Sequence, residues 1–374
     1  MSILLLIIGL ILFIGLVVVH ELGHFWAARR NGVEVEEFGI GFPPRAWSRK
    51  TKAGYDFSLN WLPIGGFVKL KGESDAAKEK GSLGAATTWA KTKIMLAGVF
   101  VNLLVGIGLL TVLAWVGMPQ LLPNQFTVDS DTKVLRSEVY SGYVEPGSPA
   151  AKAGLESGDR IDAFTVDGKK YAIDDADDLS PFTEKHAGQK VTMTYERDDR
   201  TKTVAVTLRD AKTVEASRKT DKPKGYLGVT PGEYKMTRST WSAPVVALGL
   251  TKQIVVETFR GLGNAIGAVF QGNGSKAAEQ VSGPVGIVFV LKESSLLGYQ
   301  YVLLIIAIIS LTLAIMNVLP IPALDGGRLY MILLTRLFGK ELSQEMEERI
   351  VGASFIFLLF LIVLITIVDV RRFF

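Results

Sequence analysis

The sequence predicts a polytopic α-helical membrane protein with four transmembrane helices, a small membrane-associated β-element and a β-rich domain outside the membrane. Four apolar stretches are each long enough to cross a bilayer, which takes about 20 residues. Hydrophobic residues make up 48% of the chain, a share that suits a mixture of membrane and soluble parts. A polar segment at 125–235 lies between the second and third stretches and has enough residues for a core of its own.

The first apolar stretch belongs to a predicted transmembrane segment at 1–31, which we interpret as a retained helix. It has neither the basic start nor the clear cleavage site of a secretory signal peptide. The other transmembrane segments are predicted at 93–118, 298–340 and 350–370. The connecting segment at 241–297 begins with an amphipathic stretch, Trp241–Arg260, that is typical of a helix on the membrane surface.

Ionisable side chains end the first apolar stretch, in the order His20-Glu21-Leu22-Gly23-His24. On a helix the two histidines share one face, and Glu21 lies beside them. This is the H-E-x-x-H pattern, in which two imidazoles bind zinc and the glutamate takes a proton from water. The alternative is a chance match of buried, hydrogen-bonded histidines. The chain has only three histidines, and ionisable groups in a membrane helix mark functional sites, so we favour a metal site.

A third metal ligand must be a carboxylate or the distant His186, because the chain has no cysteine. Asp325 is the best candidate. It follows Pro320 and Pro322, which should break the third span at the depth where the motif lies. Asp325 could also be the N-cap of a helix at 327–339, and the two roles are compatible. His186 itself we interpret as a surface histidine.

Two asparagines lie within predicted spans. Asn317 is close to Asp325 in sequence and is a candidate contact for the substrate or an oxyanion. Asn102 lies in the second span. Either asparagine could instead serve as a hydrogen-bonding contact between helices.

The loop at 32–92 alternates apolar and polar residues at 33–42 and 55–71, which predicts a short hairpin or small sheet. Two interpretations remain open. The hairpin is purely structural, or it is an edge strand near the metal site that pairs with an unwound substrate segment. Lysine and arginine are frequent in this loop and absent from Pro119 to Val128. By the positive-inside rule the loop is cytoplasmic and the domain at 125–235 is extracytoplasmic.

Together these motifs resemble those of the site-2 protease family of intramembrane metalloproteases. The resemblance is closest to the bacterial regulator of sigma-E protease type, which carries a PDZ domain. It spans nearly the whole chain and includes His20-Glu21-Leu22-Gly23-His24, Gly-Phe-Val-Lys at 66–69, Ala97-Gly98 with Asn102, the segment 144–161, Ser282-Gly283-Pro284 and Asn317 with Pro320-Ile321-Pro322 and Leu324-Asp325-Gly326. Two departures are room for only one PDZ domain where many relatives have two, and Gly98-Val99 where the family often has Gly-Pro.

The resemblance implies a zinc metalloendopeptidase with His20, His24 and Asp325 as metal ligands and Glu21 as catalytic base. It implies that Asn317 helps to hold substrate, and we count Asn102 as a second candidate substrate-binding residue. The domain at 125–235 would be PDZ-like, and residues 33–71 would receive substrate. Such enzymes cut transmembrane segments of single-span proteins in the cytoplasmic membrane, as in regulated intramembrane proteolysis of anti-sigma factors or removal of signal-peptide remnants.

Two other functions stay open from the sequence. The first is a membrane-anchored PDZ scaffold without proteolytic activity. The second is a membrane-anchored zinc protease that acts on unfolded membrane proteins from the cytoplasmic side. Nucleic acid is not an expected partner, because the net charge of +4 is small and spread along the chain. The lipid bilayer and single-span membrane proteins are the expected partners, and the sequence does not specify an oligomeric state.

Overall fold

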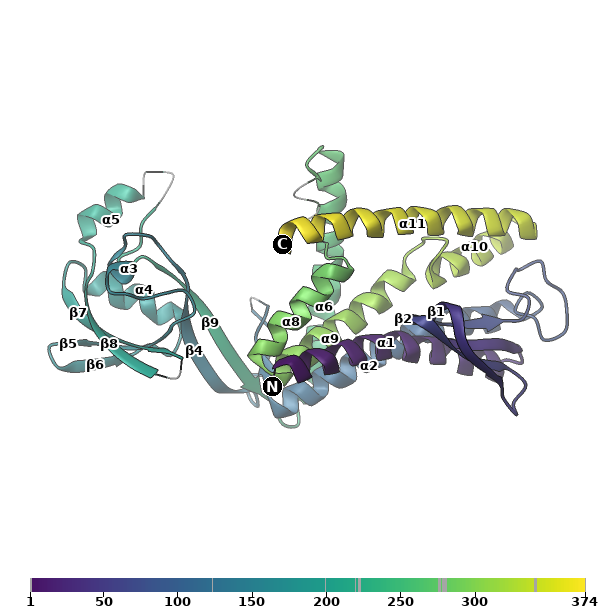
Figure 1. Cartoon of the computed structure of the whole chain (residues 1–374), viewed down its shortest axis with the longest axis horizontal. Helices are drawn as coiled ribbons and strands as arrows, with labels where there is room; N and C mark the ends of the chain where they lie inside the picture. Colours follow the sequence, from purple (N-terminus) through teal and green to yellow (C-terminus); the bar gives the residue numbers. More distant parts are fainter. Residues whose placement is uncertain are drawn as a thin grey trace. The chain divides into compact units, whose positions relative to one another are not determined.

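The chain folds into two compact units, drawn in Figure 1. The computed structural model describes residues 2–122, 124–198, 200–218, 220, 223–274, 277, 281–339 and 342–373. The first unit, here called the membrane unit, comprises Met1–Val116, Gln125–Val128 and Trp241–Phe374. The second, here called the β domain, comprises Gly117–Asn124 and Asp129–Thr240.

Four helices of the membrane unit are long and apolar enough to cross a bilayer, as the sequence predicted. They are α1 (Ser2–Arg30), α2 (Thr88–Val116), α9 (Tyr299–Val318) and α11 (Gln344–Phe373). The third predicted segment contains α9 and, after the break expected at its prolines, α10 (Asp325–Leu337). Helix α8 (Pro284–Leu297) precedes α9 and lies in the predicted connecting segment. The amphipathic segment is the start of α6 (Ala243–Phe270), which is not among the four candidate spans.

Helices α1, α2 and α9 pack closely because glycines lie where they meet. A Cβ atom on Gly23 of α1 would lie 2.8 Å from the main-chain oxygen of Ala97 on α2. One on Gly106 of α2 would lie 2.6 Å from the side chain of Leu311 on α9. Small residues at such contacts let helix backbones approach inside a membrane, where apolar side chains gain little by leaving lipid.

Helix α11 is attached to the rest of the unit by a buried carboxylate near each end. Near its start, Glu347 accepts hydrogen bonds from the Ser74 hydroxyl (2.8 Å) and the Asp75 amide (3.0 Å). Near its end, Asp369 accepts two bonds of 2.8 Å from the amides of Gly283 and Gly286 at the start of α8. Between these contacts none of the apolar span of α11 is buried, which suits a surface covered by lipid.

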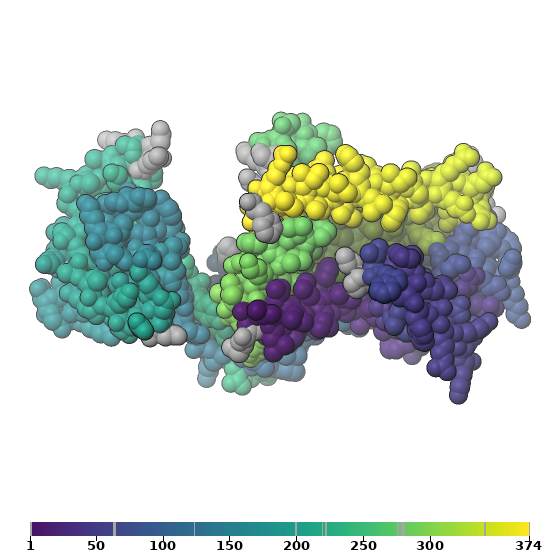
Figure 2. All heavy atoms as spheres, in the orientation of Figure 1, coloured from purple at the N-terminus to yellow at the C-terminus, as the bar shows by residue number. Residues whose placement is uncertain are grey.

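The predicted hairpin consists of β1 (Val35–Lys50) and β2 (Asp56–Leu70), two strands that each bend back on themselves. The pairings Phe38–Val68, Phe38–Phe57 and Arg49–Phe57 give four segments in the order 66–70, 35–42, 56–60 and 45–50. This ribbon projects from the helices (Figure 2). Segment 66–70 is one of its edges and lies against α1.

The β domain is built on an antiparallel sheet of seven strands in the order β3-β9-β4-β5-β7-β8, with β6 paired to β5. The strands are β3 (Met118–Pro119), β4 (Lys133–Val144), β5 (Arg160–Val166), β6 (Lys169–Ala172), β7 (Lys190–Arg197), β8 (Arg200–Thr207) and β9 (Val229–Arg238). The helices are α3 (Pro149–Lys152), α4 (Ala176–Lys185) and α5 (Ala211–Ser217).

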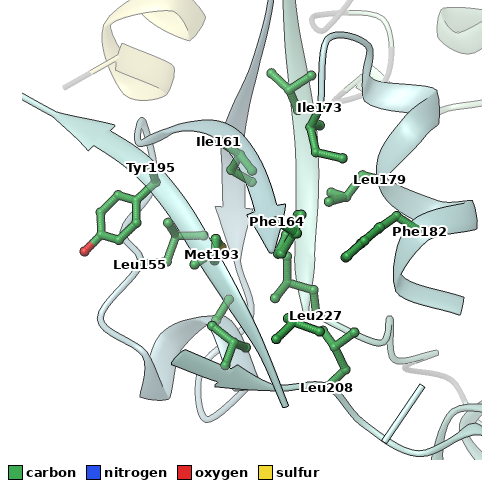
Figure 3. Close-up of a cluster of buried hydrophobic side chains, with 14 residues drawn as sticks. Leu155, Ile161, Phe164, Ile173, Leu179, Phe182, Met193, Tyr195, Leu208 and Leu227 are labelled. Atoms are coloured by element: carbon green, nitrogen blue, oxygen red, sulfur yellow. The ribbon is translucent and has the colours of Figure 1, made fainter. Parts of the chain in front are cut away.

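Helix α4 covers the core of the β domain, and Figure 3 shows its Leu179 and Phe182 facing the sheet residue Phe164. The rings of Phe164 and Phe182 stack with their centroids 4.7 Å apart. His186 caps the C-terminus of α4, and the prediction that it is a surface residue was wrong. It is only 7% exposed, because the cap turns its ring under the helix against Phe182 and Tyr171.

Candidate metal centre

Two imidazoles face one point from the C-terminal third of α1. His20 and His24 are one helical turn apart, and their Nε2 atoms lie 3.1 Å from each other. Both side chains are buried, and the rings meet edge to face with centroids 4.8 Å apart. The two groups that the motif predicted as ligands therefore do share one face of the helix.

Asp325 reaches the same point from the start of α10. Helix α9 ends at Val318, the chain becomes extended at Leu319, and α10 begins at Asp325. Side chains on Gly326 and Gly327 would overlap the main-chain oxygens of Val318 and Ile321, so only glycine allows the first turn of α10 to fold back this tightly. Leu324, not Asp325, is the N-cap, and the Asp325 carboxylate points to the histidines instead.

The three side chains form a nearly regular triangle of ligand atoms. The Asp325 Oδ2 atom lies 3.1 Å from His20 Nε2 and 3.2 Å from His24 Nε2. Two ligand atoms of a tetrahedral zinc ion are separated by about 3.3 Å, given bond lengths of about 2.0–2.1 Å. Within the described residues this is the one group of histidine and carboxylate side chains close enough to share a metal ion. The donor set and its spacing fit zinc.

The chemistry of the triangle also calls for a cation. A proton on one imidazole can form a hydrogen bond between only two of the three ligand atoms. A cation placed between them can bind all three. The Nδ1 atom of His24 lies 2.7 Å from the main-chain oxygen of Ile94, which can only accept a hydrogen bond. The proton of neutral His24 is therefore on Nδ1, and its Nε2 offers a lone pair to the centre.

Helix α2 forms the wall behind the two imidazoles, through three residues spaced four apart. Ile94 accepts the hydrogen bond from His24. A Cβ atom on Gly98 would lie 2.5 Å from His24 Nε2 and 2.6 Å from His20 Nε2, so no larger residue fits there. Asn102 lies next to His20, with 3.3 Å between the amide Nδ2 and the ring Nδ1.

Glu21 lies beside the triangle and contacts the β-ribbon. Its Oε2 atom accepts a hydrogen bond of 3.0 Å from the main-chain amide of Val68. No hydrogen bond to its Oε1 atom is found in the part of the chain that the structure describes. Glu21 and Asp325 are partly exposed, whereas the two histidines are buried. The site is thus closed by α2 on one side and accessible on the side of its carboxylates.

The two remaining candidate residues differ in burial and in their contacts with the histidines. Asn102 is 1% exposed and touches His20, whereas Asn317 is partly buried in the last turn of α9. A substrate contact by either asparagine stays a prediction. The roles of Gly98, the Ile94 carbonyl and the Val68 amide were missed. A glycine one turn before Asn102 in an apolar span was the signal for the first, and main-chain groups leave no signal in a sequence.

Comparisons with known proteins identify the family of the chain. The sequence profile of peptidase family M50 matches residues 8–361. A candidate zinc metalloprotease of Clostridium perfringens is 32% identical over 369 residues, which cover 97% of this chain and 98% of the relative. A candidate zinc metalloprotease of Fusobacterium nucleatum is 31% identical over 98% of this chain and 97% of the relative. Eep, a candidate protease of Enterococcus faecalis, is 26% identical over 98% of both chains. The chain therefore belongs to peptidase family M50, the site-2 protease family of membrane metalloproteases that its motifs resemble.

Proposed function

We propose that this protein is a zinc endopeptidase that cuts single-span membrane proteins within or near their transmembrane segments. The observation that carries this proposal is the triangle of His20, His24 and Asp325. Its two histidines lie on α1, a helix able to span a bilayer. The name zinc metalloprotease given to several relatives supports the choice of metal. Two imidazoles and one carboxylate leave a fourth position for water or substrate, as in catalytic zinc sites.

Zinc held by these three residues would supply Lewis-acid chemistry and make water acidic near neutral pH. Glu21 is the general base. It is adjacent to His20 in sequence, and its Oε1 atom has no hydrogen-bond partner among the described residues, so that oxygen can take the proton. The Val68 amide holds Oε2 and thereby orients the carboxylate. The hydroxide left by water attacks the carbonyl carbon of the peptide bond, the C–N bond breaks, and Glu21 passes the proton to the leaving amine.

The outer edge of segment 66–70 is the proposed place for substrate. Residues 66–70 pair with β1 on one side only. The main-chain amides of Val68 and Leu70 donate to Glu21 and Glu73, so these groups face away from β1. The Val68 amide points to Glu21, which brings this edge to the catalytic base. A helical substrate hides its carbonyls in hydrogen bonds and must unwind before hydrolysis. An unwound segment that pairs with this edge would be held extended beside Glu21.

The β domain is proposed to be PDZ-like and to control access to the site. A groove of about 340 Å³ lies between α4 and the start of β9. It is lined by Leu179, Thr183, Leu227 and Val229. PDZ domains bind the end of an extended chain in a groove of this kind. The domain would either bind trimmed C-termini or exclude substrates with large external parts, so that a first cut outside the membrane precedes the second.

We place the protein in the cytoplasmic membrane, with the metal site near the cytoplasmic face and the β domain outside. The basic residues of the β-ribbon loop and the lack of basic residues after α2 support this orientation. Exposed Trp47 and Trp61 on the ribbon suit contact with the membrane interface. Anti-sigma factors and signal-peptide remnants are the proposed classes of substrate.

The central test compares the wild type with Glu21→Gln, using a purified single-span substrate with and without its external part. The amide keeps an acceptor for Val68, so Glu21→Gln should retain zinc and lose cleavage by at least about 10²-fold. Asp325→Ala should lose both zinc and cleavage. Full cleavage by Glu21→Gln would overturn the proposal and favour another catalyst. Equal phenotypes in cells for both proteins, without cleavage by either, would favour a scaffold.

A further inference from the structure

Asn102 has an environment that a substrate-binding residue would not need. It lies at the centre of α2, is 1% exposed, and places its amide 3.3 Å from Nδ1 of His20. Its main-chain oxygen accepts a 2.8 Å hydrogen bond from the hydroxyl of Ser310 on α9, which is fully buried. The other end of its amide, Oδ1, is buried without a hydrogen-bond partner in the described part of the chain. Asn102 is thus held between α2 and α9, and within the described residues its side-chain amide has a hydrogen-bond partner only in His20.

The state of His20 decides which end of the amide must face it. His20 points Nε2 into the triangle, and a lone pair is available there only when the ring proton is on Nδ1. That proton needs an acceptor. Within the described residues, Asn102 is the one group at hydrogen-bond distance from Nδ1. An amide oxygen and an amide nitrogen occupy nearly the same space, so a half-turn of the Asn102 amide places its oxygen at Nδ1 without other movement.

His24 shows the same arrangement with a group that cannot be turned. Its Nδ1 faces the main-chain oxygen of Ile94, two helical turns before Asn102 on the same face of α2. One helix therefore places a polar group behind each imidazole. The main-chain oxygen of Ile94 lies behind His24, and the side-chain amide of Asn102 lies behind His20.

We propose, on the basis of the zinc site proposed above, that Asn102 is a positioning residue of that site and not a substrate contact. Its amide oxygen accepts a hydrogen bond from Nδ1–H of His20. This bond fixes the tautomer of the ring and turns Nε2 toward His24 and Asp325. Hydrogen-bond acceptors that contact zinc-bound histidines in this way strengthen metal binding. Their loss typically lowers metal affinity about 10- to 100-fold.

The test measures metal affinity in the full-length protein, purified in detergent, by competition with a zinc chelator and by visible absorption after cobalt(II) replaces zinc. Asn102→Leu removes the acceptor at similar size, and Asn102→Asp keeps an acceptor. Thr111→Val is the matched control, because Thr111 is on the same helix and its hydroxyl donates to the Ile107 carbonyl of that helix. We expect zinc to bind about 10- to 100-fold more weakly to Asn102→Leu, with an altered cobalt spectrum. Asn102→Asp and Thr111→Val should bind zinc as tightly as the wild type or, for the aspartate, more tightly.

Each other outcome has a distinct meaning. If Asn102→Leu binds zinc like the wild type but cuts substrate poorly, Asn102 is a substrate contact and the inference is wrong. If Asn102→Asp weakens zinc as much as Asn102→Leu does, the residue acts through packing and the inference is also wrong. If the wild type itself binds no zinc, the proposed function fails before the role of Asn102 is reached.

Discussion

His24 donates the hydrogen on its Nδ1 to the main-chain oxygen of Ile94 across 2.7 Å, so α2 determines which nitrogen of the α1 residue is free. The H-E-x-x-H pattern lies wholly on α1, yet its histidines depend on a second helix for tautomer and orientation. Gly98 and Asn102 continue the same face of α2. The metal centre is therefore a property of two packed helices and the start of a third.

Gly98→Ala should damage the metal centre without removing any ligand. Its methyl group would lie about 2.5 Å from the Nε2 atoms of both histidines and would push the rings apart. We expect a loss of zinc affinity of at least about tenfold, measured by competition with a chelator. Gly108→Ala is the control, since a Cβ atom there meets nothing within 4 Å. Equal zinc binding by Gly98→Ala and the wild type would contradict this close packing of Gly98 against the histidines.

Removal of the metal should destabilise the membrane unit and leave the β domain unchanged. A ligand that binds only the folded state at 1,000 times its Kd adds about 4 kcal/mol to the free energy of unfolding. A strong chelator should therefore lower the thermal midpoint of the membrane unit. Loss of protease resistance in α1 and α2 on heating measures that midpoint. The midpoint of the β domain, which forms its own compact unit, should not move. A parallel fall of both midpoints would show that the units do not unfold separately.

Asp369→Ala should release the C-terminal end of α11 from α8. The change leaves the amides of Gly283 and Gly286 without their acceptor. The chain has no cysteine, so a pair placed at Phe289 and Phe373, whose rings stack at 4.3 Å, reports on this contact through a bifunctional thiol reagent. Crosslinking should be strong with Asp369 present and fall severalfold in Asp369→Ala. Arg371→Ala, a change at an exposed neighbour, should leave it intact, and crosslinking that persists in Asp369→Ala would count against the attachment.

The β domain should lose stability in acid through Asp159. Burial acts to raise the pKa of Asp159, but hydrogen bonds from Arg197 and from the Glu156 amide outweigh it and hold the pKa below its ordinary value. A carboxyl with a lowered pKa in the folded state stabilises above its unfolded pKa. That stability is lost as the pH falls through about 4 toward the folded value.

Asp159→Asn tests this expectation. It should lower the thermal midpoint of the β domain by about 5 °C at pH 7 and flatten its decrease between about pH 5 and pH 3. Circular dichroism of the full-length protein follows the transition. Asp167→Asn, in the turn between β5 and β6, provides a comparison carboxylate. An unchanged pH profile in Asp159→Asn would mean that other carboxyls govern acid stability.

The sequence was sufficient for the spans and for the three side chains of the triangle. Charge-free stretches of about 20 residues have few alternatives to a membrane helix, and two histidines four apart can lie only on one helical face. Asp325 was found because Pro320 and Pro322 had to end α9 near the depth of His20.

What the sequence did not provide are contacts between main-chain atoms and side chains. The Ile94 carbonyl and the Val68 amide exist in every residue, so no residue type marks them. His186 was misjudged because a cap at the end of α4 can turn a side chain inward, and the pattern of a ten-residue helix does not reveal this. The bend of β1 and β2 into four segments likewise depends on pairing across the ribbon and not on alternation within a strand.

The separation of 305 residues between His20 and Asp325 has a consequence for the protein during its synthesis. At about 5–20 residues per second, a ribosome needs roughly 15 to 60 seconds to reach Asp325 after His20 has been made. In that interval α1 enters the membrane and can pack against α2, but the triangle lacks its third corner. A nascent chain therefore has no complete metal centre until its ribbon, its β domain and most of its helices have been made. Biosynthetic order alone keeps an unfinished protease from acting on its neighbours in the bilayer.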